Sequence, residues 1–318
     1  MNRRHFLQLS VAAVSAIGVG GCSGTAPLRT GIHPWIGYEP LYLAEEFGWL
    51  SNSVHLLKGA AASDSMSGLL SGELDAAALT LDEALRVFSQ GIPLRIVAVT
   101  NVSVGADMLV VKPSITSLGS LSGRAIGVEL GGVSGVLLFA VLERAGLNTD
   151  QVSVIDLPVH RHPEAWQNGI IDASICYEPT ATALMKAGGT RLFDSSQIPE
   201  TIFDTLVVTE QAARRQPEAV RDLVYGHFRG LRHLVRSMHD AVYRVATRQG
   251  ITPDAVHQSL ATIMLPELSA NQRYLAYHGR IEVVARRLTD VLIREGLMET
   301  RPVYDRLADP SFLPRSMS

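Results

Sequence analysis

The chain has 318 residues, of which 47% are hydrophobic and 19% are charged, and its formal net charge at pH 7 is −3. A chain of this length can bury a large core and usually divides into two domains. Its 28 basic residues are outnumbered by 31 acidic ones, so nothing in the charge predicts a nucleic-acid partner.

The first residues are typical of an export signal. Arg3 and Arg4 precede a short apolar run that ends in Val19-Gly20-Gly21-Cys22. The run is shorter than the roughly 20 apolar residues of a permanent membrane helix. We expect residues 1–21 to be a signal peptide. Its removal leaves 26 basic against 31 acidic residues, a net charge of about −5.

The segment that ends at Cys22 resembles the lipobox of bacterial lipoproteins. This resemblance implies that Cys22 carries lipid, that residues 22–27 are a tether, and that the protein is exported and anchored to a membrane. Arg3 and Arg4 also resemble the twin-arginine export motif, and the general secretory route stays open as the alternative. Ser23 resembles an outer-membrane sorting signal, although the sequence leaves the choice of membrane open. Cys176 is expected to be a small buried residue.

Strands and helices alternate from residue 28 to residue 193, which predicts parallel βαβ units and an α/β fold. The expected strands are residues 28–32, 54–57, 75–79, 94–100, 125–129, 152–157, 172–177 and 190–193. The expected helices are residues 40–47, 66–70, 81–88, 136–145, 163–168 and 179–187. After residue 216 the pattern is almost wholly helical, with Pro217 and Pro253 at first helical positions and an amphipathic stretch at 281–296.

A short motif occurs twice and divides the chain. Asp107–Val111 and Asp204–Val208 share the pattern D-x-L-V-V. We interpret the two segments as hinge strands around 107–111 and 204–208 that carry the chain out of one lobe and back. Lobe one would then hold residues 28–108 and 209–318, and lobe two residues 109–204. Two crossings of this kind form a hinge that allows closure around a ligand.

The mature chain resembles the solute-binding proteins of ABC importers for nitrate, sulfonates and thiamine-pyrimidine precursors. The resemblance rests on the order and spacing of motifs within residues 34–49, 71–77, 121–129 and 169–179, namely P-W-x-G-Y-x-P-L-Y-L-A-x-x-x-G-W, S-G-E-L-D-A-A, L-x-G-R-A-I-G-V-E and G-x-x-D-A-x-x-x-Y-E-P. It implies a two-lobed, type II periplasmic-binding fold, in which each lobe is a mostly parallel sheet flanked by helices and the C-terminal region is helical. A small ligand would bind between the lobes, with a permease and its ATPase as partners. We expect a monomer that needs no cofactor or metal.

Ligands of open parallel sheets bind beyond the carboxyl ends of the strands, so the loops at that edge supply the candidate site. Trp35, Tyr38 and Glu39 follow the first strand, and the aromatic pair could stack on a flat or cationic ligand. Further candidates stand before helices: Ser63, Thr80, Asp82, Gly131, Gly132 and Ser134. The alternative role of the serine, threonine and aspartate side chains is to cap those helices. Glycines would allow backbone N–H groups to approach a ligand at a helix N-terminus.

The same loops carry many acids and few bases. The acids are Glu39, Asp64, Asp82, Glu83, Glu129, Glu178 and Asp204, and the candidate cations are Lys58 and Arg161. This balance favours an amine or a nitrogen heterocycle such as a pyrimidine over a sulfonate or nitrate, which is the alternative ligand class. Glu178, directly after a strand, is the strongest candidate. A helix cap or an inter-lobe ion pair is its alternative role.

The two alternative functions are an enzyme and a lipoprotein that presents its ligand to a sensor. The fold also resembles the pyrimidine synthase of fungal thiamine biosynthesis, but the cysteine-rich iron site of that enzyme cannot be carried over to a chain with Cys176 as its one cysteine besides Cys22. No G-x-S-x-G or H-E-x-x-H pattern occurs, so we expect no catalytic residue. A lipoprotein that presents its ligand to a sensor would need the same closing cleft, and the sequence does not distinguish that role from transport.

Overall fold

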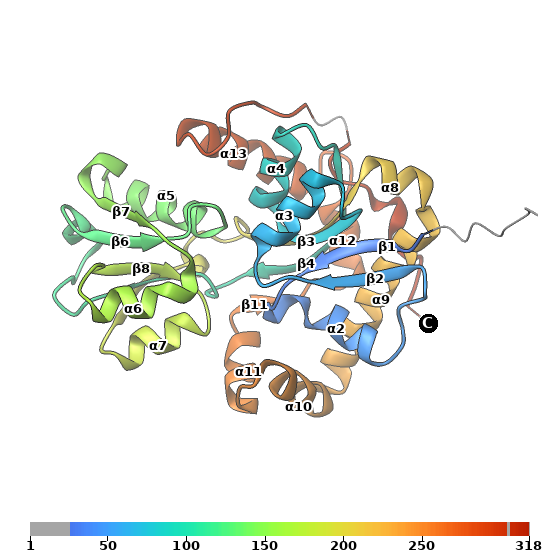
Figure 1. Cartoon of the computed structure of the whole chain (residues 1–318), viewed down its shortest axis with the longest axis horizontal. Coiled ribbons are helices and arrows are strands. Elements are labelled where there is room, and N and C mark those ends of the chain that lie inside the picture. The colour runs from blue at the N-terminus through green and yellow to red at the C-terminus, as the bar shows by residue number, and fades with distance from the viewer. Residues whose placement is uncertain (1–25, 304–305, 318) are drawn as a thin grey trace, which may run out of the picture.

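The computed structural model describes residues 26–303 and 306–317. The expected signal peptide and Cys22 lie outside these residues. Two α/β lobes stand side by side, the smaller one holding the middle of the chain (Figure 1). Within the described ranges no helix is both long enough and apolar enough to cross a membrane.

The larger lobe is built on a six-stranded sheet in the order β11-β4-β10-β3-β1-β2. The strands are β1 (Leu28–Ile32), β2 (Val54–Lys58), β3 (Ala76–Thr80), β4 (Leu94–Ser103), β10 (Phe203–Thr209) and β11 (Ile263–Met264). β1 pairs in parallel with β2 and β3, whereas β10 is antiparallel to both β3 and β4. The sheet is therefore mixed, and its parallel strands β3, β1 and β2 lie at the β2 edge.

The smaller lobe is built on a five-stranded sheet in the order β7-β6-β8-β5-β9. The strands are β5 (Met108–Val111), β6 (Ala125–Val128), β7 (Ser153–Asp156), β8 (Ala173–Cys176) and β9 (Thr190–Asp194). β6 is parallel to β7 and β8, and β5 is antiparallel to β8 and β9. The two sheets thus share one pairing scheme, in which β1, β2, β3, β10 and β4 correspond to β6, β7, β8, β5 and β9.

Helices cover both faces of each sheet (Figure 1). Those of the larger lobe are α2 (Glu39–Glu46), α3 (Ala62–Ser71), α4 (Leu81–Ser89), α8 (Glu210–Arg215), α9 (Pro217–Arg236), α10 (Met238–Gln249), α11 (Pro253–Leu260), α12 (Leu268–Tyr274) and α13 (Arg280–Arg294). Those of the smaller lobe are α5 (Ser134–Ala145), α6 (His162–Gln167) and α7 (Thr180–Lys186). Short 3-10 helices lie at Ile36–Tyr38, Leu118–Leu121, Thr149–Gln151, Val159–Arg161, Ser195–Gln197 and Pro310–Phe312. The predicted α/β class, the two-lobed architecture and the helical C-terminal region are confirmed.

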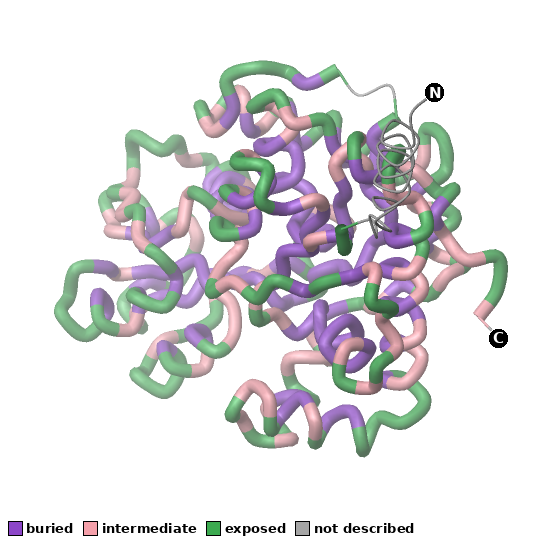
Figure 2. The backbone as a smooth tube through the Cα atoms, turned by 45° about the vertical axis from the view of Figure 1, so that its right-hand side comes forward, coloured by how far each residue is buried: buried purple, intermediate pink, exposed green. Residues whose placement is uncertain are grey.

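Alternation along the strands creates a core on each face of each sheet. In β3, Ala77 and Leu79 pack with α3, α4 and α13, whereas Ala76 and Ala78 pack with α2 and α9. The two faces of β5 are likewise divided between the α5 side and the α6–α7 side. Buried residues therefore gather along the central strands of both sheets, while exposed residues lie in loops and on the outer faces of the helices (Figure 2). Cys176 of β8 is buried, as its apolar strand predicts.

The two D-x-L-V-V segments lie in different sheets. Asp107 immediately precedes β5, and Asp204 is the second residue of β10. Leu109 pairs with Ile175 of β8, and Leu206 pairs with Ala78 of β3, so the two motifs occupy corresponding positions. The segment 204–208, which the sequence predicts to be a hinge strand beginning at the last residue of lobe two, pairs along its length within the larger sheet. We propose that the chain crosses between the lobes in the segments that precede β5 and β10, at residues 104–107 and 195–202.

Candidate ligand-binding site

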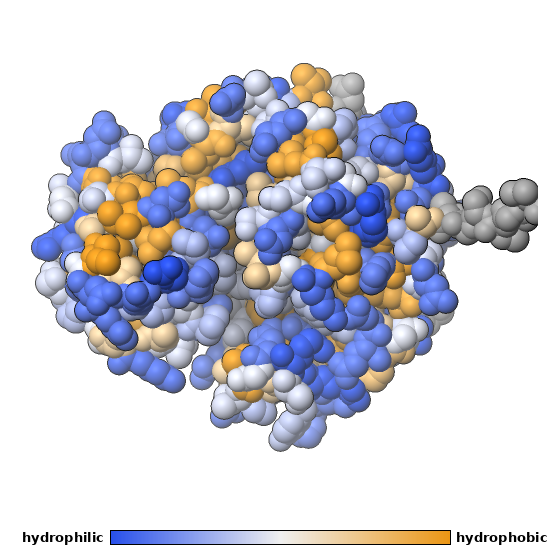
Figure 3. Space-filling view, in the orientation of Figure 1, coloured by the Kyte–Doolittle hydropathy of each residue, from blue (hydrophilic) through white to orange (hydrophobic). Residues whose placement is uncertain are grey.

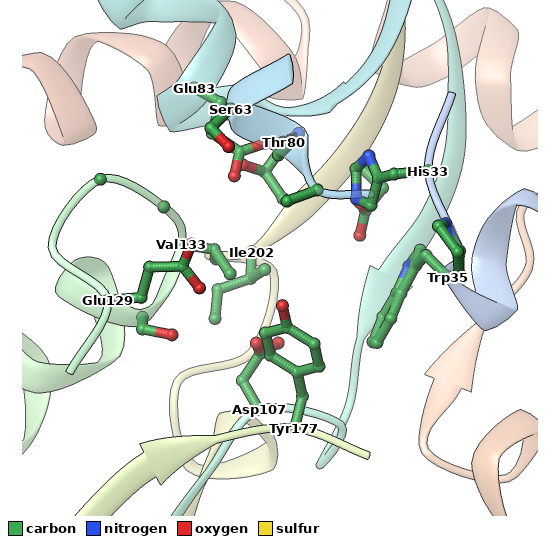
Figure 4. Close-up of a pocket in the computed structure, with 17 residues that line it drawn as sticks. His33, Trp35, Ser63, Thr80, Glu83, Asp107, Glu129, Val133, Tyr177 and Ile202 are labelled. Atoms are coloured by element: carbon green, nitrogen blue, oxygen red, sulfur yellow. Dashed lines mark hydrogen bonds between the residues drawn. The ribbon is translucent and has the colours of Figure 1, made fainter. Parts of the chain in front are cut away.

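A pocket lies where the corresponding strand ends of the two sheets face each other (Figure 4). About 690 Å³ between its lining residues is not filled by protein, part of it open to solvent. The lining residues are His33, Pro34, Trp35, Ala61, Ala62, Ser63, Thr80, Glu83, Asp107, Glu129, Gly131, Gly132, Val133, Ser134, Tyr177, Ile202 and Asp204. On the molecular surface, the outline is notched between the lobes, and hydrophilic and hydrophobic residues are interspersed on this face (Figure 3).

Shared topology places three pairs of corresponding residues in the pocket. Asp204 pairs with Thr80 at the end of β3, and Met108 pairs with Cys176 at the end of β8. Asp107 directly precedes Met108, and Tyr177 directly follows Cys176. Asp107 therefore corresponds to Asp204, and Tyr177 corresponds to Thr80. His33 after β1 and Glu129 after β6 form the third pair. All six residues line the pocket, and only the aspartates are identical.

Four carboxylates dominate its charge: Glu83, Asp107, Glu129 and Asp204. Among the described residues that line it there is no lysine or arginine. Burial raises the pKa of Glu83 to about 7, helped by the charge of Asp82, and raises the pKa of Asp107 to about 6. Burial also raises the pKa of Asp204 well above its ordinary value, and the neighbouring charge of Asp107 adds to the rise. Burial away from a lining cation therefore favours the neutral form of Glu83, Asp107 and Asp204.

Asp204 is held at one of its two oxygens. The hydroxyl of Tyr38 donates a 2.6 Å hydrogen bond to Oδ1 of Asp204, and both residues are buried. This hydrogen bond favours the ionised carboxylate and partly opposes the effect of burial on its pKa.

Glu83 and its neighbours form the α4 side of the pocket. Oε2 of Glu83 accepts a 2.9 Å hydrogen bond from the backbone N–H of Thr80, which caps the helix. Asp82 accepts a 2.9 Å bond from the Thr80 hydroxyl and lies 3.8 Å from the guanidinium of Arg86. Arg86 in turn donates to the backbone oxygen of Leu130 in the smaller lobe. Glu83 is therefore fixed beside an inter-lobe contact.

The aromatic side of the pocket also joins the lobes. The rings of Trp35 and Tyr177 meet edge to face, with centroids 5.7 Å apart. Tyr177 follows β8 of the smaller lobe and Trp35 follows β1 of the larger lobe (Figure 4). His33 lies beside them with Nδ1 buried and unpaired, and burial lowers its pKa to about 4. His33 is thus neutral near pH 7 and adds no positive charge to the pocket.

Seven of the residues expected to bind ligand line this pocket: Trp35, Ser63, Thr80, Gly131, Gly132, Ser134 and Asp204. Four others do not, and each has a different partner. Tyr38 lies behind Asp204, and Asp82 lies behind Thr80. Glu39 is buried on the outer side of α2, where it pairs with Arg248 and Gln249.

Glu178 takes the alternative role of a helix cap. Its two carboxylate oxygens accept hydrogen bonds of 3.1 and 3.0 Å from the backbone N–H and the hydroxyl of Thr182 in the first turn of α7. It therefore faces its own helix, and the preceding residue, Tyr177, lines the pocket instead. Side chains alternate sides at a strand end, so a shift of one residue exchanges a pocket position for a cap.

Reasoning from the sequence named Glu83 and Glu129 as rim acids and passed over His33, Asp107 and Tyr177 as site residues. The repeated D-x-L-V-V pattern held the missing signal for Asp107, since it equates this residue with Asp204. In the described part of the chain, no group of three His, Cys, Asp or Glu side chains is arranged to hold a metal ion.

The two lobes, with a pocket between corresponding strand ends, form a fold of the periplasmic-binding type. The sequence model of the NMT1-like family matches residues 22–248, well over half of the chain. The chain belongs to this family, which confirms the resemblance stated above.

Three individual proteins are similar to this chain in sequence or in structure. The chain is 29% identical over 156 residues to the taurine-binding periplasmic protein of Escherichia coli strain K12, a match that covers 48% of each chain and so spans about half the length of that relative. The alkanesulfonate-binding protein SsuA of Xanthomonas axonopodis pv. citri, solved bound to MOPS, has a TM-score of 0.73 at 18% identity, covering 90% of this chain and 97% of that one. The desulfurization enzyme DSZB has a TM-score of 0.66 at 17% identity, with 90% and 97% covered. At these identities the two structures show the fold alone.

Proposed function

We propose that this chain is the exported substrate-binding protein of an ABC importer and that it binds a small organic solute through a protonated amine or an N–H-rich heterocycle. The lobes would close on the solute and deliver it to a membrane permease. The ligand shifts the equilibrium between the open and closed lobes only as far as it binds the closed form more tightly than the open form. No reaction on the ligand is proposed, although an enzyme shares the fold.

The charge of the pocket carries this proposal. Glu83, Asp107, Glu129 and Asp204 line it together, and no lysine or arginine is among its described lining residues. Two unit charges 4 Å apart interact with about 4 kcal/mol at an effective dielectric constant of 20. A cation therefore gains from each ionised neighbour, whereas a sulfonate would require the carboxyl groups to stay protonated.

The taurine-binding and alkanesulfonate-binding relatives favour the alternative, a sulfonate ligand. Two features of the pocket are compatible with an anion: Ser63 near the start of α3 and the loop from Gly131 to Ser134 at the start of α5. Backbone N–H groups at helix N-termini attract anions. Taurine itself carries both a sulfonate and an ammonium group. The question is therefore which of the two charges the pocket requires.

Three two-carbon probes separate the two ligand classes. Ethanolamine carries only the ammonium group, isethionate only the sulfonate, and taurine both. Thermal unfolding of the purified chain would be measured with each probe at increasing concentration. A ligand at 100 times its dissociation constant stabilises the folded state by about 2.7 kcal/mol.

We expect ethanolamine and taurine to raise the melting temperature and isethionate to leave it unchanged. Stabilisation by isethionate without ethanolamine would replace the amine by an anion and leave the binding-protein role standing. Stabilisation by no small molecule of either class would remove the basis of the importer proposal and favour the enzyme alternative.

The cellular role has its own test. We propose that Cys22 holds the protein on the membrane and that the permease receives the ligand there. A Cys22→Ser variant should move from the membrane fraction to the soluble periplasmic fraction. Loss of the chain should abolish uptake of radiolabelled ligand. Normal uptake combined with a lost transcriptional response to the ligand would favour the sensor alternative over transport.

A further inference from the structure

Asp107 and Asp204 occupy corresponding places in the two lobes and face one pocket. Asp107 immediately precedes β5 and Asp204 is the second residue of β10, and these two strands run antiparallel to β8 and β3, respectively. Each is only 3% exposed, and both line the space between the lobes. The pocket therefore has one aspartate from each side of the crossing.

The backbone beneath the pair is fixed by hydrogen bonds between the two crossings. Ser195 donates its backbone N–H to the carbonyl of Asp107 at 2.9 Å, and the hydroxyl groups of Ser103 and Ser195 lie 2.6 Å apart. The N–H of Gly105 donates to the Ser195 hydroxyl at 2.7 Å. On the other side, Tyr38 holds Oδ1 of Asp204. These bonds hold the backbone carbonyl of Asp107 and one carboxylate oxygen of Asp204.

No lysine or arginine is among the described residues that line the pocket around the pair. The titratable groups that face it are His33 after β1, Tyr38 before α2, Asp82 and Glu83 on α4, Glu129 after β6 and Tyr177 after β8. Arg86, the nearest described arginine on these elements, is directed to Asp82 and Leu130. Both carboxyl groups line one pocket and are buried, and the charge of Asp107 adds to the raised pKa of Asp204.

We propose that Asp107 and Asp204 together hold one protonated nitrogen of the ligand, each lobe supplying one carboxylate. This inference rests on the proposed function. It goes beyond that function by naming the subsite, its two residues and a consequence: both carboxylates must be ionised when the cation binds. Binding of the cation therefore releases protons from the pocket.

A double-mutant cycle tests whether the two residues act on the same nitrogen. Dissociation constants of ethanolamine and putrescine would be measured by calorimetry for the wild-type chain, Asp107→Asn, Asp204→Asn and the double variant. We expect each single variant to weaken binding at least tenfold. The double variant should lose clearly less than the product of the two single losses, because residues that share one partner are coupled. Asp172→Asn, which alters a carboxylate paired with Lys112 in the same lobe, is the matched control and should bind as the wild type does.

Proton release supplies a second readout. Titration of a weakly buffered protein solution with ethanolamine adjusted to the same pH should release protons that a pH electrode detects, and fewer of them from Asp107→Asn. Thermal unfolding of each variant without ligand checks that it folds, and Asp107→Ser replaces Asp107→Asn if that variant does not. If amines bind the wild type and both asparagine variants equally, the subsite is wrong while the ligand class stands. If neither amine binds the wild type, the ligand class and the subsite are both wrong.

Discussion

Arg86 on α4 of the larger lobe donates a 2.7 Å hydrogen bond to the backbone oxygen of Leu130 in the smaller lobe. The same guanidinium is the buried ionic partner of Asp82, so one side chain joins the lobes and compensates a buried carboxylate. The amphipathic helix α13 of the larger lobe also contacts α5 of the smaller lobe. The lobes are therefore connected by side chains as well as by the two crossings.

Arg86→Met should destabilise the protein by about 3–5 kcal/mol, because it leaves Asp82 as an uncompensated buried charge. Unfolding in guanidinium chloride measures the loss. The variant Asp82→Asn/Arg86→Met should recover a large part of it, since the remaining amide carries no charge. A double variant as unstable as Arg86→Met alone would show that the contact with Leu130, and not the ion pair, accounts for the loss.

Tyr38→Phe should lower the free energy of unfolding by about 1–3 kcal/mol, the usual effect of leaving a buried hydrogen-bonding partner unpaired. The partner is Asp204, whose pKa should rise further without the hydroxyl donor. Tyr42→Phe is the matched control, because Tyr42 packs in the same core cluster. Urea unfolding of both variants gives the comparison, and equal losses would contradict the role assigned to the Tyr38 hydroxyl.

Stability without ligand should fall as the pH rises through the range set by the pocket carboxyl groups. The folded state raises the pKa of Asp107 from 3.8 to about 6 and that of Glu83 from 4.5 to about 7. It therefore binds protons more tightly than the unfolded chain, and this stabilisation is lost between about pH 4 and pH 7.

For Asp107 the predicted loss is about 3 kcal/mol. Three histidines act in the opposite direction, because burial lowers the pKa of His162 and lowers the pKa values of His33 and His227 to about 4. Their contribution to the free energy of unfolding increases as the pH rises from about 4 to 6.5. The measurement is therefore the difference between wild type and Asp107→Asn in unfolding free energy at pH 4, 5, 6 and 7. A difference that does not change with pH would contradict the raised pKa of Asp107.

Glu178→Gln should leave ligand binding within twofold of wild type and cost about 1 kcal/mol of stability, because the glutamate only accepts hydrogen bonds from Thr182. Calorimetry with ethanolamine and thermal unfolding give the two values. Asp204→Asn, measured in parallel, should instead weaken ligand binding strongly and change the stability little. A tenfold weakening by Glu178→Gln would place this side chain on the ligand after all.

Ligand binding should change the fluorescence of Trp35 and of neither other tryptophan. Trp35 contacts Tyr177 across the pocket, whereas Trp166 is buried in the core of the smaller lobe and Trp49 stacks on Phe47 beyond α2. In a titration followed by tryptophan emission, Trp35→Phe should remove the signal and Trp49→Phe should retain it. A signal that persists in Trp35→Phe would mean that the ligand does not reach this aromatic pair.

The sequence by itself determined the elements of this protein and its family. Apolar periodicity, helix-starting prolines and turn residues act within a few residues of one another, so strands such as 28–32 and helices such as 81–88 could be placed within one or a few residues of their ends. The order of short motifs indicated the two-lobed fold, and the surplus of acids in the loops anticipated a pocket lined by carboxylates.

Only the tertiary structure decided which of those acids face the pocket. Glu178 and Asp107 each stand at the end of a strand, yet one caps its own helix and the other lines the space between the lobes. Strand register sets this outcome, since a shift of one residue turns a side chain to the other face. Register depends on pairing between segments far apart in the chain, such as β5 with β8 and β10 with β3. The pairing of Asp107 with Asp204 is therefore a property of the assembled sheets, although its two halves were visible in the sequence as one repeated motif.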